Sequence, residues 1–308
     1  MPPTLSTPNV STSEFCLGGC ADPAKSELLA SLEHSEFRTK FNRSPFKIRH
    51  NLTDHRLFTL DALVALSQEL PKDRVEYNAG DVPVTQDPNR TPQNGLSIAE
   101  TIERIENCRS WMVLKNVEQH PEYKELLETC LEEVRPFAEL ASKGMTHQQG
   151  FIFISSPGSM TPFHIDPENN FLLQIQGTKE VWMFDQNDRD VISEIQIEEF
   201  FAGAHRNMPF DESYRGRGAK FDLIAGEGLH FPVVAPHYVH NGPAVSVSFS
   251  VTFQTEDSAD RQSLHRFNRQ LRKLGVNPSD VGQNPNADSR KLSFLRMMRK
   301  IKKWTNRG

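Results

Sequence analysis

The sequence predicts a mainly β protein, an antiparallel sandwich or barrel with flanking helices. From Gly150 onward, short apolar runs follow one another between Gly, Pro and Asp residues, as strands do between tight turns. No helix-like segment lies between these runs, which favours antiparallel neighbours. Residues 245–253, VSVSFSVTF, alternate strictly between apolar residues and Ser or Thr. Such alternation indicates a strand that divides two environments.

The N-terminal half predicts a different organisation. Residues 1–24 are rich in Ser, Thr and Pro and are expected to be loose, and residues 25–145 are expected to form an α/β extension. Within that extension the patterns indicate helices at 25–41, 59–70, from 97 and at 122–140, strands at 46–50 and 111–115, and a long loop at 78–95. Ser97 and Glu100 have the spacing of a capping box, which marks the start of a helix.

Composition favours a cytoplasmic protein without a membrane span. No segment approaches the roughly 20 apolar residues that cross a bilayer, and the first residues lack the pattern of a secretory signal. The four cysteines have no zinc-finger spacing. Cys108 and Cys130 lie in helix-like stretches and are expected to be free thiols. Cys16 and Cys20 could pair or bind a metal, but are expected to be free too.

One metal-ligand pattern stands out in the β region. His164 and Asp166 are two residues apart, so on a strand their side chains point to the same face. A second imidazole is available downstream at His237, with His240 as its competitor, and spacing favours His237. Two histidines and one carboxylate form the facial triad of non-haem iron(II) proteins. Alone, a His-x-Asp pattern is weak, because a long chain often contains one by chance.

The sequence around this pattern is more specific. Residues 161–179, TPFHIDPENNFLLQIQGTK, resemble the metal-binding strands of the jumonji-C hydroxylases, nearest in motif to the asparaginyl hydroxylase that inhibits hypoxia-inducible factor. The shared features are a threonine three residues before the histidine, an Asn-Phe pair, a Gln-Ile-x-Gly turn and the lysine that follows it. Similarity resumes at 226–232, GEGLHFP, and at His237-x-Val239-x-Asn241. Glu227 departs from the aspartate that is usual there.

The resemblance implies a double-stranded β-helix, the jelly-roll of cupins, at 146–257, with C-terminal helices at 258–308. It implies an iron(II)- and 2-oxoglutarate-dependent dioxygenase that uses O2 to hydroxylate an unidentified small molecule, lipid-linked molecule or protein side chain. His164, Asp166 and His237 would be the catalytic metal ligands. The co-substrate would contact Thr161, Asn170 and Lys179, with Ser250 or Ser248 where the related hydroxylase has Asn. The alternative is a non-catalytic cupin that binds a ligand and regulates through its tail.

The C-terminal tail has the opposite charge to the rest of the chain. Residues 261–308 contain 13 Lys and Arg against two acidic residues, a net charge of +11, and residues 1–260 have a net charge of −16. Residues 289–304 predict a basic amphipathic helix, which suits an anionic membrane surface or an acidic partner. Its apolar side could instead pack on the body or form a homodimer, as the C-terminal helices of related jumonji proteins do. No DNA-reading motif is present.

Overall fold

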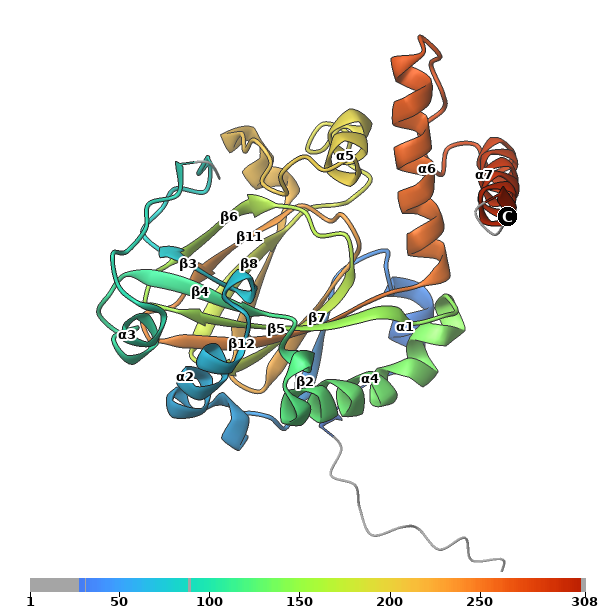
Figure 1. Cartoon of the computed structure of the whole chain (residues 1–308). Helices are drawn as coiled ribbons and strands as arrows, with labels where there is room; N and C mark the ends of the chain where they lie inside the picture. The colour runs from blue at the N-terminus through green and yellow to red at the C-terminus, as the bar shows by residue number, and fades with distance from the viewer. Residues whose placement is uncertain (1–27, 31, 88–89, 306–308) are drawn as a thin grey trace, which may run out of the picture.

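Two antiparallel sheets form the centre of the molecule (Figure 1). The computed structural model describes residues 28–30, 32–87 and 90–305. The larger sheet has the order β1-β2-β10-β7-β12-β5-β4-β3, and the smaller sheet has the order β6-β11-β8-β9. The strands of the larger sheet are β1 (Leu29–Ala30), β2 (Phe46–His50), β3 (Val75–Ala79), β4 (Ser110–Lys115), β5 (Thr146–Ser155), β7 (Asn169–Gln176), β10 (Glu227–Phe231) and β12 (Ser246–Gln254). Those of the smaller sheet are β6 (Met160–His164), β8 (Thr178–Met183), β9 (Ala219–Ile224) and β11 (His237–Asn241).

Strand β12 shows why the alternating sequence was informative. It pairs with β5 on one side and β7 on the other, so it is an inner strand of the larger sheet. Phe249 and Phe253, on its apolar face, are fully buried and contact the rings of Phe58 and Phe41 in the N-terminal extension. The Ser and Thr residues point the other way, into the space between the two sheets. The strand therefore separates an apolar core from a polar interior, as predicted.

Helices cover the outer face of the larger sheet and continue past it. They are α1 (His34–Lys40), α2 (Leu60–Glu69), α3 (Ile98–Glu103), α4 (Pro121–Ala141), α5 (Glu194–Phe201), α6 (Glu256–Lys273) and α7 (Pro285–Thr305). Short 3-10 helices lie at Arg56–Phe58, Lys72–Arg74, Val117–Gln119 and Glu212–Arg217. The main core cluster joins α1, α2 and α4 to β5, β7 and β12. Helices α2 and α4 lie along one side of the sheet in Figure 1.

The observed elements confirm the predicted fold class and correct some details. The capping box of Ser97 and Glu100 is present at the start of α3. Helix α5 was not predicted, although Ser193 and Gln196 form the same kind of box in front of it. The last helix begins at Pro285 rather than Ser289, because proline is well suited to the first position of a helix. The expectations for residues 1–24, including Cys16 and Cys20, lie outside the described residues. No helix in the described ranges is long and apolar enough to cross a membrane.

Candidate metal centre

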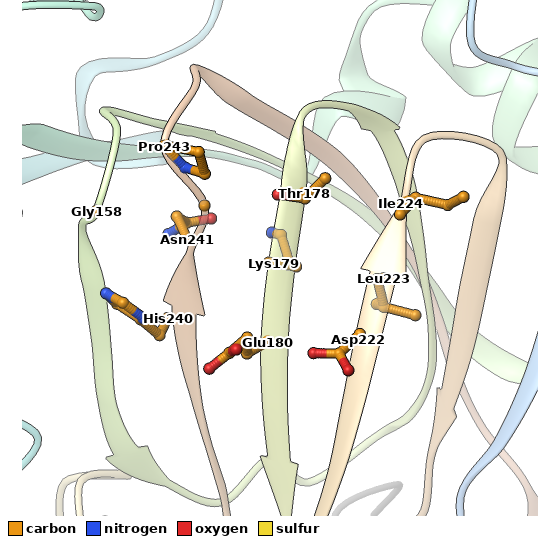
Figure 2. A pocket seen from close by; sticks show the side chains of 11 residues that line it. Gly158, Thr178, Lys179, Glu180, Asp222, Leu223, Ile224, His240, Asn241 and Pro243 are labelled. Atoms are coloured by element: carbon orange, nitrogen blue, oxygen red, sulfur yellow. The ribbon is translucent and has the colours of Figure 1, made fainter.

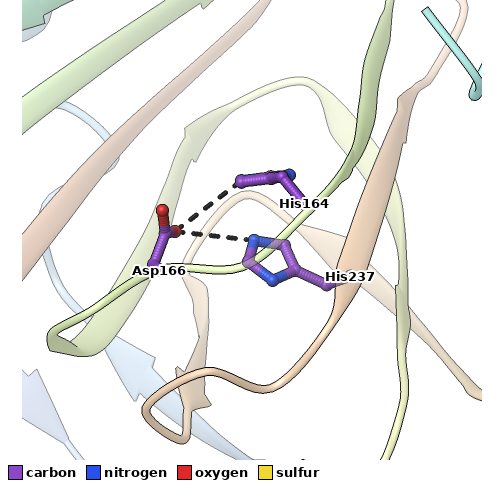
Figure 3. Close-up of side chains that lie close together, drawn as sticks. All are labelled: His164, Asp166 and His237. Atoms are coloured by element: carbon purple, nitrogen blue, oxygen red, sulfur yellow. Dashed lines mark ion pairs between the residues drawn. The ribbon is translucent and has the colours of Figure 1, made fainter. Parts of the chain in front are cut away.

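Strand pairing in the smaller sheet brings two histidines together. His164 ends β6 and His237 begins β11, and the register of the two strands sets these residues opposite each other. Their ring centroids are 4.0 Å apart. Asp166 follows β6 and turns back, so that its Oδ2 lies 3.7 Å from Nε2 of His164 and 3.7 Å from Nε2 of His237 (Figure 3). One ligand atom from each residue lies within 4.8 Å of the others, a spacing that suits a single metal ion.

Backbone carbonyls orient both imidazoles. Nδ1 of His164 lies 2.8 Å from the carbonyl oxygen of Pro162, and Nδ1 of His237 lies 2.9 Å from that of Ala235. A ring whose Nδ1–H donates to a carbonyl presents the lone pair of Nε2, which is the tautomer that a metal requires. Burial also lowers the pKa of His237 to about 3, which favours the neutral ring. The two nitrogens that face Asp166 are therefore prepared as ligands.

Asp166 has a further partner that the sequence did not indicate. Arg206 donates from Nη1 to Oδ1 of Asp166 at 3.1 Å, while Oδ2 faces the two histidines. Burial alone would raise the pKa of Asp166, but the neighbouring His164, Arg206 and His237 outweigh it and hold that pKa below its usual range. Arg206 comes from the segment after α5. The backbone N–H of Ile165 donates a hydrogen bond to the carbonyl oxygen of Arg206, which holds this segment beside the end of β6. No sequence motif marks this arginine.

A cavity extends from the metal centre into the space between the sheets. It brings together the triad and the four residues that the resemblance assigned to the co-substrate. Its lining is Phe153, Ser155, Thr161, His164, Asp166, Asn170, Leu172, Lys179, Phe231, His237, Val239 and Ser250. Two polar atoms of this lining, Ser250 Oγ and Asn170 Oδ1, are buried without a hydrogen-bond partner in the structure. Because buried polar groups are normally paired, these atoms indicate room for a polar ligand.

Lys179 is the most unusual group in this cavity. Only 5% of the residue is exposed, and within the described residues no carboxylate pairs with it. Its Nζ donates to Ser248 Oγ at 2.6 Å, and burial lowers the pKa of Lys179 to about 7. Gly177 directs the chain into this strand: its φ is +73°, and a Cβ there would lie 2.3 Å from the carbonyl oxygen of Val245. An unpaired buried cation is well suited to an anionic ligand.

A second, larger groove also reaches the metal centre. It shares Phe153, Thr161, His164 and Asp166 with the inner cavity and continues over β4 and β3. Its further lining is Glu76, Asn78, Val82, Thr91, Gln93, Trp111, Val113, Lys115, Phe151, Pro162, His205, Arg206 and Asn207. The triad therefore lies where the inner cavity and this larger groove meet, which gives a co-substrate and a substrate separate spaces beside one metal.

The competing histidines lie elsewhere. His240 is exposed on the outer face of β11, beside a surface hollow that also includes Glu180 and Asp222 (Figure 2). Successive residues of a strand face opposite sides, so His237 and His240 cannot both reach the interior. His230 is fully buried, accepts a hydrogen bond from the backbone N–H of Asn42 at 3.0 Å, and has its pKa lowered to about 3 by burial. Its role is structural.

Comparison with known proteins gives one family match. A family model described as a cupin-like domain matches residues 32–286. A search of curated proteins found no match. Among solved structures, YcfD, a ribosomal oxygenase from Escherichia coli, is 16% identical with a TM-score of 0.47, over 89% of this chain and 67% of that chain. YcfD in complex with cobalt and 2-oxoglutarate is 18% identical with a TM-score of 0.46, over 88% and 66%. These structural likenesses are too distant to support a statement about function.

Proposed function

The chain belongs to the cupin-like family, and we propose that it is an iron(II)- and 2-oxoglutarate-dependent dioxygenase. One observation supports this proposal above the others. A buried pair of imidazoles and a carboxylate converge at one end of a cavity whose other polar groups include an unpaired buried lysine. A cavity that only bound a neutral ligand would need neither the preformed metal site nor the buried cation.

The donor set fits iron(II). His164 and His237 would bind it through Nε2, and Asp166 through Oδ2, which is the 2-His-1-carboxylate set of non-haem iron oxygenases. Such a triad leaves other coordination positions free for a co-substrate and O2. Arg206 holds the second oxygen of Asp166 and so keeps the carboxylate turned toward the histidines.

The polar groups that line the inner cavity suit the carboxylates of 2-oxoglutarate. Lys179 would pair with the carboxylate remote from the metal, and Thr161, Asn170 and Ser250 would offer hydrogen bonds nearby. When bound, iron(II) and 2-oxoglutarate supply the activation of O2 that leads to hydroxylation of a C–H bond. Leu172, Phe231 and Val239 complete the lining with apolar surface. This apolar lining excludes water and strengthens the pairing of Lys179 with an anion.

The substrate would enter by the larger groove. Trp111, Val113 and Phe151 give its floor an apolar character, while Glu76, Asn78 and Lys115 make its outer part polar. A small molecule, a lipid-linked molecule and a protein side chain are all compatible with such a surface. We also propose a reducing, cytoplasmic compartment, which the free thiols of Cys108 and Cys130 support.

An anaerobic titration tests the proposal. Metal-free protein is expected to bind one iron(II) per chain, and a weak visible absorbance band is expected only after both iron(II) and 2-oxoglutarate are added. Asp166→Ala should remove the band, and His240→Ala is the matched control that should keep it. If the folded wild-type protein binds neither compound, the dioxygenase proposal is wrong. Binding of both without conversion of 2-oxoglutarate to succinate on any metabolite or peptide would favour the non-catalytic alternative.

A further inference from the structure

The last helix exposes a continuous apolar surface. Phe294, Met297, Met298 and Ile301 are 44%, 51%, 46% and 48% exposed, and we call these four residues the α7 stripe. Their spacing of three and four residues places them on one face of the helix. Single exposed apolar residues are common on protein surfaces, but a row of four large ones marks an interaction site.

Contacts with α6 fix the direction of the α7 stripe, and at one edge of the stripe the ring of Phe294 lies 5.7 Å from that of Phe267 in α6. Leu292 and Leu295 are half-buried, Arg296 pairs with Asp260 at 2.6 Å, and Arg299 donates to Ser263 Oγ at 2.8 Å. These contacts hold α7 against α6. In Figure 1, α6 separates α7 from the two sheets. The face of α7 opposite α6 therefore points away from the body.

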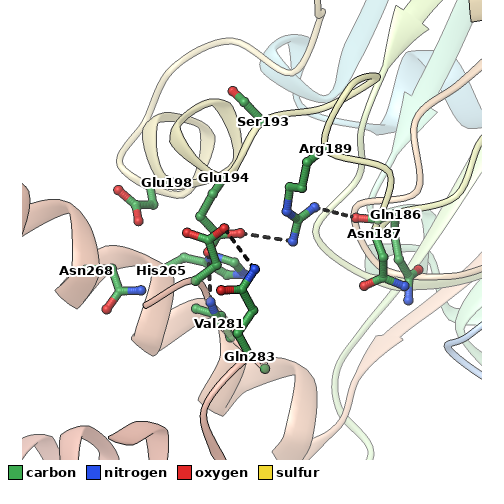
Figure 4. Close-up of polar contacts among 12 residues, drawn as sticks. Gln186, Asn187, Arg189, Ser193, Glu194, Glu198, His265, Asn268, Val281 and Gln283 are labelled. Atoms are coloured by element: carbon green, nitrogen blue, oxygen red, sulfur yellow. Dashed lines mark hydrogen bonds and ion pairs between the residues drawn. The ribbon is translucent and has the colours of Figure 1, made fainter. Parts of the chain in front are cut away.

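A buried polar cluster anchors this arrangement to the central fold (Figure 4). Glu194 of α5 pairs with Nδ1 of His265 in α6 at 2.8 Å and accepts the backbone N–H of Val281 at 3.2 Å. Arg189 lies 3.0 Å from the other carboxylate oxygen of Glu194. The segment before α5, helix α6 and the loop before α7 thus meet at one carboxylate, which holds α6 and the approach to α7 on the body of the protein.

The charge around the α7 stripe has one sign. Residues 289–308 contain eight Lys and Arg and no Asp or Glu. Arg290 and Lys300 are exposed and make no ion pair with the described residues, and Lys302 and Lys303 follow in the next turn of the helix. A long apolar row flanked by cations is the pattern of a helix that lies in the plane of an anionic bilayer.

We propose that α7 docks the protein on an anionic lipid surface, with the α7 stripe among the acyl chains and the flanking cations at the headgroups. Two copies joined through their stripes would bring these cations together without an acidic group to balance them, which is unfavourable. The other exposed large apolar residues of the described chain lie outside α7, and no more than two of them share a segment, so they offer the α7 stripe no matching row. They are Leu140, Ile195, Ile224, Leu274 and Val276. This proposal is independent of the proposed enzyme activity.

Flotation with vesicles tests the proposal on the full chain. Binding is expected to vesicles of equal parts phosphatidylcholine and phosphatidylserine in low salt, and high salt should weaken it because salt screens exposed charges. Vesicles of phosphatidylcholine alone should bind at least about tenfold less protein, since each cation near an anionic surface contributes about 1 kcal/mol.

Matched variants separate the α7 stripe from general charge effects. Met298→Asp should reduce vesicle binding about tenfold or more, since it places a charge among acyl chains. Leu274→Asp makes the same charge change at an exposed site outside the α7 stripe and should have a much smaller effect. Both variants should keep the melting temperature of the wild type. Equal binding by both variants, or no binding to anionic vesicles by folded wild type, would overturn the proposal. Loss of a dimer in Met298→Asp by light scattering, without vesicle binding by the wild type, would assign the α7 stripe to a second copy instead.

Discussion

The ammonium group of Lys179 and the hydroxyl of Ser248 meet at 2.6 Å between the two sheets. Lys179 belongs to β8 of the smaller sheet and Ser248 to β12 of the larger one, so the contact bridges the interior. A serine hydroxyl does not neutralise a buried cation. Keeping this cation in the interior is therefore electrostatically costly, and pairing with an anion would offset that cost.

The first prediction concerns the stability of the ligand-free protein. Lys179 has a pKa of about 7 in the folded protein, against the ordinary lysine pKa of 10.5 in the unfolded chain. Between these values the unfolded chain holds a proton that the folded chain has released, so stability rises with pH across this window. Lys179→Met removes the penalty. Denaturant unfolding should show that the free energy of unfolding of Lys179→Met exceeds that of the wild type by on the order of 2–5 kcal/mol below pH 7, and that the difference shrinks toward pH 10. A gain independent of pH would contradict this account.

The second prediction concerns the affinity for 2-oxoglutarate. Lys179→Met should weaken its binding roughly ten- to hundredfold, because a hydrogen bond to a charged group contributes about 1.5–3 kcal/mol. Affinity for the metal should stay nearly unchanged, since Lys179 is not a ligand. Lys220→Met, on the exposed neighbouring strand, is the control. Calorimetry on the metal-loaded protein measures both constants, and equal affinities in the two variants would place Lys179 outside the co-substrate site.

The third prediction distinguishes the two histidines of β11. His237→Ala should lower metal affinity by at least about 100-fold, because a facial triad that loses an imidazole keeps only two ligands. His240→Ala should leave metal affinity within about twofold of wild type, as this side chain faces outward. Titration with iron(II) or cobalt(II) measures both. The reverse pattern would mean that the register of β11 differs in solution.

The fourth prediction gives Arg206 a positioning role. Arg206→Gln should weaken metal binding about tenfold, because partners that orient a metal ligand typically contribute 10- to 100-fold in affinity. Arg206→Lys should recover part of the loss, since it can still place a cation beside Oδ1 of Asp166. Arg217→Gln removes an exposed arginine that pairs with Asp188 and should have no effect on the metal. A purely structural role for Arg206 would show as a lower melting temperature with unchanged metal affinity.

The fifth prediction concerns β12, the strand that separates the apolar core from the polar interior. Phe249→Ala should cost about 3–5 kcal/mol of unfolding free energy, because the side chain is fully buried and leaves a cavity. Phe294→Ala, in the α7 stripe, should cost much less in solution since that ring is 44% exposed. Urea unfolding of both variants measures the difference. Similar losses in the two would show that the last helix is a larger part of the core than its exposure indicates.

The sequence was informative where a local pattern has a direct structural meaning. Alternation in β12 predicted which face is polar, and the spacing of His164 and Asp166 predicted that both approach one point. The preference for His237 over His240 agrees with the inward face of β11, since strand alternation sets these two side chains on opposite sides. His237 and His240 lie within one strand, so periodicity determines where they point. Asp166 lies just beyond β6, and it approaches His164 because the chain turns back there.

Long-range contacts could not be predicted in this way. Arg206 reaches Asp166 only because the segment after α5 folds back over β6, and no pattern near residue 206 records that path. The resemblance left Ser248 and Ser250 as alternatives for one role. The structure gives them different surroundings, since Ser248 accepts a hydrogen bond from Lys179, whereas Ser250 Oγ has no hydrogen-bond partner among the described residues. Both face the interior from the same strand, so only their contacts with the other sheet distinguish them.

The position of β12 has a consequence for how the chain reaches its fold during synthesis. This strand fills the gap between β5 and β7, yet it leaves the ribosome after both of them. Until residues 246–254 emerge, β5 and β7 present unpaired edges rich in Phe, Ile and Leu, which is the kind of surface that aggregates. Pairings between distant segments also make folding slow. We therefore expect nascent chains that stop before β12 to bind chaperones strongly, and release to follow soon after that strand appears.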